Sequence, residues 1–122
     1  MIIYASRTGN VRYIVQKLGL PAKDLADVDK IDAPYLLFTY TDGLGSVPPI
    51  VDQFMTANYN QCKGIIVSGN RNFGHAFFGR AGDLLAAQYG IPLIEKVEMR
   101  GAPSNYETIK DYYYSIWKEA SI

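Results

Sequence analysis

The sequence predicts an α/β protein in which helices cover both faces of a parallel β-sheet. Short apolar runs alternate with amphipathic segments along the chain, as expected when strands and helices alternate. Some of the runs are apolar on both faces, which is typical of central strands in a parallel sheet. A chain of 122 residues fits one domain, so we expect residues 1–122 to fold as a single unit.

Five segments are predicted to contain strands. The runs 34–40 (PYLLFTY) and 64–69 (GIIVSG) are apolar on both faces, which indicates central strands. The chain starts with a third buried strand at 1–5 (MIIYA), and 21–27 (PAKDLAD) is expected to hold a short one. Because apolar and polar residues alternate in 91–99 (IPLIEKVEM), this strand is predicted to lie at an edge or to have one solvated face.

The first two helices are predicted at 10–21 and 46–59. Gly19 can end the first in the left-handed conformation, and Pro21 prevents its continuation. Its apolar face is formed by Val11, Ile14, Val15 and Leu18. The second is expected to begin with Ser46 as its cap and prolines near its first turn. Its apolar face is predicted to comprise Ile50, Val51, Phe54 and Met55.

The last two helices are predicted at 79–90, closed by Gly90, and at 104–120. Ser104 and Glu107 have the spacing of a capping box, which places the start of the final helix at Ser104. Apolar and aromatic residues recur in that helix at helical spacing: Tyr106, Ile109, Tyr113, Ile116 and Trp117.

Composition and charge exclude several classes of function. Twelve basic residues balance twelve acidic ones, so the net charge favours neither a nucleic-acid partner nor a membrane surface. No run reaches the ~20 apolar residues of a membrane span. Cys62 is the only cysteine, which precludes an internal disulfide and favours a cytoplasmic location. With a single histidine, His75, and no clustered ligands, we expect no metal site.

Three polar, glycine-rich loops are predicted at one edge of the sheet. Right-handed crossovers bring the loops 6–10, 41–47 and 69–78 to the carboxyl ends of the strands. Ligands of open α/β sheets bind at this edge, near the point where the strand order reverses. These loops are therefore the candidates for a binding site.

The first loop, SRTGN, has the composition of a phosphate site. It precedes a helix, whose free N–H groups and dipole favour an anion. Ser6, Thr8 and Asn10 add neutral donors, and Gly9 allows the backbone to approach a ligand closely. No lysine of the nucleotide-triphosphatase type is present in the loop. Taken alone, the same residues are more typical of an ordinary helix cap and turn.

The other two loops add glycines and exposed aromatic residues. In TYTDGLGSVP (39–48) two glycines allow backbone conformations that can place peptide groups against a flat ligand or form a simple flexible turn. In SGNRNFGHAFFG (68–79) aromatic rings stand among polar residues, which is costly unless the rings cover a ligand, meet a partner or tuck under the loop.

Together these motifs resemble the NrdI-type flavodoxin-like family, which serves class Ib ribonucleotide reductases. The resemblance covers SxTGN, TYTDGLGSVP, SGNRNFG and GRAGD in matching order along the chain. It implies a doubly wound, flavodoxin-like five-stranded parallel sheet in the order 2-1-3-4-5, with helices on both faces. It also implies a noncovalently bound flavin mononucleotide (FMN).

The resemblance assigns cofactor binding to residues of all three loops and leaves the chemistry to FMN, with no catalytic side chain. The Gly43 peptide is expected to flip when the flavin is protonated at N5. The first loop is expected to hold the phosphate, and the other two to form the walls around the ring. The implied residues are Ser6, Arg7, Thr8, Gly9, Asn10, Val11, Thr41, Asp42, Gly43, Leu44, Ser68, Gly69, Asn70, Asn72, Phe73 and Gly74.

The function that the resemblance implies is activation of a reductase rather than classical enzymatic turnover. A flavin reductase or another electron donor would reduce FMN, which would then react with O2 to give superoxide. The superoxide would be delivered to the dimanganese, radical-generating subunit of a class Ib ribonucleotide reductase. Two alternatives stay open: a general flavodoxin-type one-electron carrier, and a flavin-free receiver-like module. The second lacks the acidic residues that it needs in the first loop.

Overall fold

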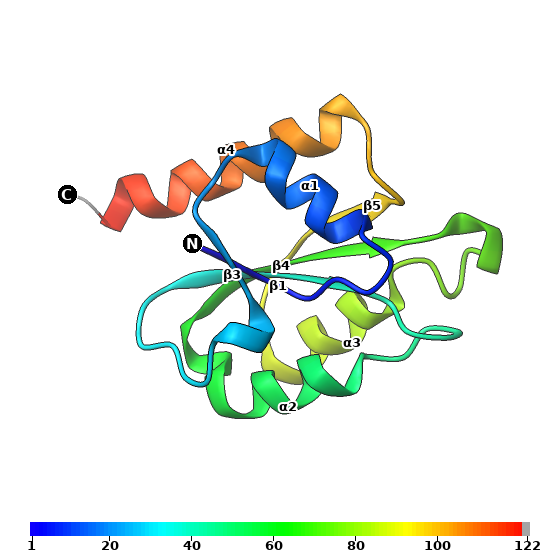
Figure 1. Cartoon of the computed structure of the whole chain (residues 1–122), viewed down its shortest axis with the longest axis horizontal. Helices are drawn as coiled ribbons and strands as arrows, with labels where there is room; N and C mark the ends of the chain where they lie inside the picture. The colour runs from blue at the N-terminus through cyan, green and yellow to red at the C-terminus, as the bar shows by residue number, and fades with distance from the viewer. Residues whose placement is uncertain (121–122) are drawn as a thin grey trace.

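A computed structural model describes residues 1–120, with side chains described through residue 117. Its five strands form one parallel sheet in the order β2-β1-β3-β4-β5 (Figure 1), which confirms the predicted flavodoxin-like fold. The strand bounds are β1 Ile2–Tyr4, β2 Ala22–Asp24, β3 Tyr35–Tyr40, β4 Cys62–Gly69 and β5 Leu93–Glu98. The order reverses between β1 and β3, so the carboxyl ends of these two strands mark the switch point.

Helices cover both faces of the sheet. In Figure 1, α1 and α4 lie above the sheet, and α2 and α3 lie below it. The helix bounds are α1 Asn10–Leu18, α2 Pro49–Asn58, α3 Arg80–Tyr89 and α4 Pro103–Ala120. Short 3-10 helices, η1 to η3, add single turns at Leu25–Asp27, Tyr59–Gln61 and Arg71–Phe73. Among residues 1–120, no helix combines the length and apolarity that crossing a membrane requires.

The sheet separates two layers of hydrophobic core, because neighbouring residues of each strand point to opposite faces. Ile2 packs with the buried face of α1 and with α4, whereas Ile3 packs with α2 and α3. On β3, Leu36 packs in the same layer as Ile2, and Leu37 packs in the same layer as Ile3. Both layers hold the strands rigidly, so the loops at their carboxyl ends start from fixed positions.

The start of α2 differs from the sequence prediction. The helix begins at Pro49 after Pro48, and no side chain caps it, so the expected Ser46 cap is wrong. Ser46 instead pairs with Asp42, and their N–H and carbonyl groups exchange hydrogen bonds of 2.8 Å in both directions. Ile50 is 46% exposed because it lies in the first turn and does not share the buried face of Val51.

The start of α4 also differs. The helix begins at Pro103, where the fixed φ of proline suits the first helical position, so Ser104 lies inside the first turn and forms no capping box with Glu107. The Oδ1 atom of Asn105 instead accepts a hydrogen bond of 2.8 Å from the Ala102 N–H. This bond is one of the side-chain contacts that fix the turn between β5 and α4.

Other predicted boundaries are confirmed. Gly19 and Gly90 end α1 and α3 with φ angles of 68° and 66°, in the left-handed region. The alternating strand is the edge strand β5, and the short strand β2 forms the opposite edge. Strand β4 starts two residues earlier than predicted because Cys62 pairs with Tyr35 of β3.

Candidate functional site

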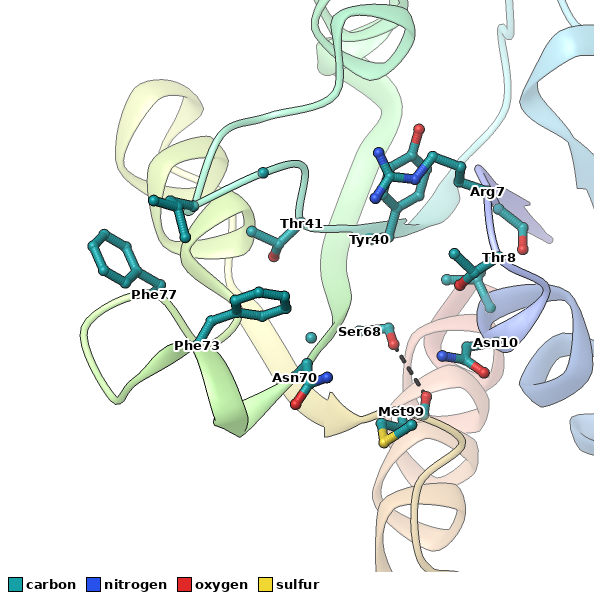
Figure 2. Close-up of a pocket in the computed structure, with 15 residues that line it drawn as sticks. Arg7, Thr8, Asn10, Tyr40, Thr41, Ser68, Asn70, Phe73, Phe77 and Met99 are labelled. Carbon is teal, nitrogen blue, oxygen red and sulfur yellow. Dashed lines mark hydrogen bonds between the residues drawn. The ribbon is translucent and has the colours of Figure 1, made fainter.

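The three polar loops meet around one cavity at the carboxyl edge of the sheet (Figure 2). Its volume of about 530 Å³ falls within the range of small-molecule sites. It lies beside the switch point between β1 and β3, as expected for this fold. The residues that line it are Ser6, Arg7, Thr8, Asn10, Val11, Tyr40, Thr41, Gly43, Leu44, Ser68, Gly69, Asn70, Phe73, Phe77 and Met99.

The first loop directs the start of α1 toward the cavity. Gly9 precedes the helix with a φ of 93°, a conformation that glycine adopts without strain. The Arg12 N–H donates to the Ser6 Oγ atom at 3.3 Å. Asn10 and Val11 open the helix, so their N–H groups have no carbonyl partner within it. Two main-chain donors and the positive end of the dipole are thus presented to a ligand.

The second loop is a tight hairpin closed by the pairing of Asp42 with Ser46. Gly43 and Gly45 inside it have φ angles of 50° and 108°. A Cβ atom on Gly45 would lie 2.7 Å from the Cδ atom of Arg80, so the loop packs closely against the start of α3. Only glycine fits this combination of backbone angle and close contact.

Thr41 contributes the most informative polar atom of the site. Its Oγ1 atom is buried and has no hydrogen-bond partner among the described residues. A buried hydroxyl without a partner costs free energy, and such groups are rare in folded proteins. Because Thr41 lines the cavity, a bound ligand is the natural partner for this hydroxyl.

An ion pair connects the first two loops. The Arg7 Nη1 atom lies 2.7 Å from Asp42 Oδ1, and the guanidinium lies over the Tyr40 ring, 5.4 Å from its centroid. Both charged side chains are partly exposed, so the pair contributes little to stability. It lies at one side of the cavity mouth, and it engages the Asp42 carboxylate with Arg7.

The third loop is organised by its asparagines. The Asn70 Oδ1 atom accepts a hydrogen bond of 2.9 Å from the Asn72 N–H, which caps the short helix η3. The Arg71 N–H donates to Glu98 Oε2 at 3.1 Å and so ties the loop to β5. Phe73 is 55% exposed and, like Phe77, projects at the cavity rim in Figure 2.

The turn after β5 forms a fourth wall that the sequence prediction missed. The Met99 N–H donates to the Gly69 carbonyl at 2.9 Å, and the Ser68 Oγ atom donates to the Met99 carbonyl at 3.1 Å (Figure 2). Met99 has a φ of 51°, an uncommon value for a residue other than glycine. A methionine carries no local signal for that conformation, so sequence reasoning had no means to place it.

Most of the predicted binding residues line the cavity, and four do not. Gly9 and Gly74 shape the ends of their loops, Asp42 closes the hairpin and pairs with Arg7, and Asn72 is exposed. The lining residues absent from the predicted set are Tyr40, Phe77 and Met99. Tyr40 could have been found from sequence, because it ends the apolar run of β3 where the second loop begins.

The residues present fit a flat, phosphorylated ligand. Main-chain donors at the start of α1 suit a phosphate, whereas Leu44 and Phe73 give the other end an apolar wall. The Thr41 hydroxyl, which has no partner among the described residues, lines the same cavity (Figure 2). Fold and cavity together define an α/β protein of the flavodoxin-like class.

Comparison with known proteins agrees with this class. The family model described as "NrdI Flavodoxin like" matches residues 2–111. Two proteins named "Protein NrdI", from Escherichia coli O139:H28 (strain E24377A / ETEC) and Shigella boydii serotype 18 (strain CDC 3083-94 / BS512), are each 32% identical to this chain over 128 residues. Both alignments cover 97% of this chain and 93% of the relative.

A solved structure is similar in fold. It is a short-chain flavodoxin associated with a non-canonical PDU bacterial microcompartment, with a TM-score of 0.64 and 16% sequence identity. The alignment covers 98% of this chain and 96% of that one, so the whole architecture is shared.

The chain belongs to the NrdI flavodoxin-like family. FMN is the cofactor of this family and of this protein, and the donors and apolar walls of the cavity fit it. The family links the chain to flavodoxin-like redox chemistry that serves ribonucleotide reductase.

Proposed function

We propose that this protein is an activation factor for a class Ib ribonucleotide reductase. FMN, when bound and reduced by a flavin reductase or another donor, supplies single electrons that convert O2 to superoxide. The protein delivers that superoxide to the dimanganese, radical-generating subunit. Its own residues bind and orient the cofactor, shape the access to it and provide the docking surface, while residues 1–122 act as one domain in the cytoplasm.

The observation that carries this proposal is the convergence of three loops on one cavity in a chain of this family. Each loop alone is compatible with an ordinary turn. Together they provide a helix start for a phosphate, a buried hydroxyl with no partner within the described part of the chain, and apolar residues at an open rim. These features suit a cofactor site that binds a phosphate at one end and a flat apolar ring at the other.

The first loop holds the phosphate in this proposal. The N–H groups of Asn10 and Val11 donate to it, and the hydroxyls of Ser6 and Thr8 can add further donors. Gly9 lets the chain turn into α1 at a φ of 93°. Arg7 stands at the rim, where its positive charge can act on the phosphate while it remains paired with Asp42.

The second and third loops orient the ring. Thr41 offers its free hydroxyl, and the exposed Gly43 tolerates either orientation of its peptide, so its carbonyl can turn inward as an acceptor for a protonated ring nitrogen. Gly69 and Asn70 lie across the cavity. We assign the ring walls to Leu44, Ser68 and Phe73, while Asp42, Asn72 and Gly74 support the loops.

The docking surface consists of the exposed apolar residues around the cavity mouth. Leu44, Phe73, Phe77 and Met99 are exposed by 63%, 55%, 36% and 49% respectively. Clustered exposed apolar side chains at a functional cavity are typical of a partner interface. Docking there would bring the dimanganese subunit to the site where superoxide forms and limit its escape to solvent.

The test is the yield of tyrosyl radical in the manganese-loaded partner subunit. Electron paramagnetic resonance would follow the radical after addition of O2 and the reduced, FMN-loaded protein. We expect a yield well above that of a matched sample with reduced free FMN and no protein. An equal yield in the two samples would refute the activation function.

A parallel measurement addresses the one-electron carrier. Under anaerobic conditions, the rate of electron transfer to a generic acceptor protein is compared with the rate of radical formation in air. A general carrier would show fast anaerobic transfer and no radical formation beyond the free-FMN control. Radical formation with slow anaerobic transfer would support the activation function.

A further inference from the structure

Arg100 of the turn between β5 and α4 contacts the predicted phosphate site from outside the three loops. We propose that Arg100 is a positioning residue that holds the Asn10 amide with its NH2 group toward the cofactor phosphate, and so makes the site selective for phosphorylated flavin. This inference rests on the FMN site described under the proposed function, and it adds a residue that the loop motifs do not contain.

The contact lies at the start of α1. The Arg100 Nε atom donates to the Asn10 Oδ1 atom at 3.4 Å, and Asn10 lines the cavity. A guanidinium has donors and no acceptor, so the amide oxygen of Asn10 must face it. The NH2 group then faces the other way, and Figure 2 shows the amide nitrogen of Asn10 on the cavity side.

Arg100 is itself held in place. Its guanidinium lies over the Tyr13 ring, 4.4 Å from the ring centroid, and Tyr13 is one turn along α1 from Asn10. Its carbonyl accepts a hydrogen bond from the Tyr106 hydroxyl of α4. The preceding residue, Met99, is bonded to β4 through both its N–H and its carbonyl. A fixed turn therefore carries the guanidinium to one face of α1.

The orientation of the amide matters because a phosphate accepts hydrogen bonds and donates none at neutral pH. An Asn10 NH2 group aimed at the phosphate donates to it, whereas a reversed amide would point its oxygen at the anion and repel it. Bonds to charged groups are stronger than neutral ones, so a wrong orientation is costly. Riboflavin lacks the phosphate, and its affinity should not depend on this contact.

The experiment is a double-mutant cycle on the apoprotein, with FMN and riboflavin affinities measured by flavin fluorescence titration. We expect Arg100→Ala to weaken FMN binding about tenfold and riboflavin binding by less than about twofold. In an Asn10→Ala background, Arg100→Ala should change FMN affinity by less than about twofold, because Arg100 acts through Asn10. The 31P resonance of bound FMN should shift in the Arg100→Ala variant.

A matched control is Arg12→Ala on the same helix. The Arg12 guanidinium bonds to Asp24 at 3.1 Å instead of to Asn10, so FMN affinity should stay within about twofold of the unaltered protein. Thermal unfolding of each apoprotein separates a folding defect from a binding defect.

Two results would overturn the inference: equal losses of FMN and riboflavin affinity in Arg100→Ala, or a full effect of Arg100→Ala in the Asn10→Ala background. Failure of the proposed function looks different. An unaltered protein that binds FMN but generates no tyrosyl radical refutes the activation role and leaves the role of Arg100 intact. An unaltered protein that binds no FMN removes both.

Discussion

Two threonines near the end of β3 have opposite surroundings. Thr39 is fully buried, and its Oγ1 atom donates to the Tyr40 carbonyl at 2.9 Å. Thr41 lies at the cavity, where its buried Oγ1 atom has no partner within the described part of the chain. The same side chain thus satisfies its hydrogen bonding in one position and remains available to a ligand in the other.

This difference predicts opposite effects of one substitution. Thr41→Val should leave the free energy of unfolding of the apoprotein unchanged or raise it by about 1 kcal/mol, because it removes an unpaired buried hydroxyl. It should also weaken FMN binding. Thr39→Val should lower the unfolding free energy by about 1 kcal/mol, since a made bond is lost. Urea unfolding measures the free energy of unfolding of each variant, and FMN titration measures its cofactor affinity. Equal destabilisation by the two substitutions would contradict the prediction.

Cys62 provides a second prediction at this scale. The thiol is buried at the start of β4, and burial raises its pKa, so little reactive thiolate forms near neutral pH. At pH 8, an aromatic disulfide reagent should modify the Cys62 thiol of the urea-unfolded protein faster than that of the native protein. We expect the two rates to differ by a factor on the order of a hundred. Absorbance of the released thiolate follows the reaction. Rapid modification of the native protein would show that β4 opens readily.

At the scale of elements, the sequence patterns predicted the strands, the helices and the starts of α1 and α3 well, but they assigned the wrong caps to α2 and α4. Apolar runs identify strands because both faces of the sheet are covered, and Gly19 and Gly90 identify helix ends because a left-handed residue is needed there. The predicted starts of α2 and α4 were wrong because serine is a good cap by residue type, which favoured Ser46 and Ser104. The prolines near them decide where each helix begins.

The site, too, could be predicted from the sequence only in part. Loops rich in glycine and polar residues were predictable, because their order along the chain places them at one sheet edge. The contributions of Met99 and Arg100 were not, because they depend on hydrogen bonds and ring contacts between segments far apart in sequence. Residues of this kind become visible only when the turn after β5 is placed against β4 and α1.

Packing between α3 and the sheet predicts the effect of a small substitution. A Cβ atom on Gly82 would lie 2.7 Å from Val67 Cγ1 and 2.8 Å from Leu93 Cδ1. Alanine favours a helix by about 1 kcal/mol over glycine, but overpacking costs about 1–3 kcal/mol. We therefore expect Gly82→Ala to lower the free energy of unfolding by about 1–2 kcal/mol.

Gly19→Ala is the matched control for this packing effect. A Cβ atom on Gly19 would have no atom within 4 Å, so the cost of the substitution comes from the φ of 68° alone, about 1 kcal/mol. Chemical denaturation compares the two variants. A Gly82→Ala variant as stable as the unaltered protein would mean that α3 can move away from β4 without loss.

At the scale of the whole molecule, a balanced total charge conceals an uneven distribution. Arg7, Arg71, Arg80 and Arg100 are all exposed and lie in or beside the loops at the carboxyl edge. Asp42 in the same region is paired with Arg7, and Glu98 accepts a main-chain hydrogen bond. Positive charge therefore gathers where an anionic cofactor would enter, although the sum over the chain is zero.

Apolar surface is unevenly distributed in the same way, and this predicts how a partner docks. Phe77 stands at the cavity rim with Leu44 and Phe73, whereas Tyr114, 57% exposed, lies on α4 beyond the turn that starts at the carboxyl edge. If the rim is the interface, Phe77→Ser should weaken binding of the manganese-loaded subunit about tenfold or more, as expected for a buried aromatic contact. Tyr114→Ser should change it by less than about twofold.

Surface plasmon resonance with the FMN-loaded variants measures their affinities for the manganese-loaded subunit. Tyrosyl radical yields of the same variants are divided by the amount of bound FMN, so that cofactor loss is not mistaken for a docking defect. Position is what distinguishes the two variants, because both substitutions replace an exposed aromatic residue with serine. A larger loss from Tyr114→Ser than from Phe77→Ser would move the interface to α4. Under the proposed activation function, superoxide formed at the cavity would then have to cross solvent to reach the subunit, and radical formation would become sensitive to added superoxide dismutase.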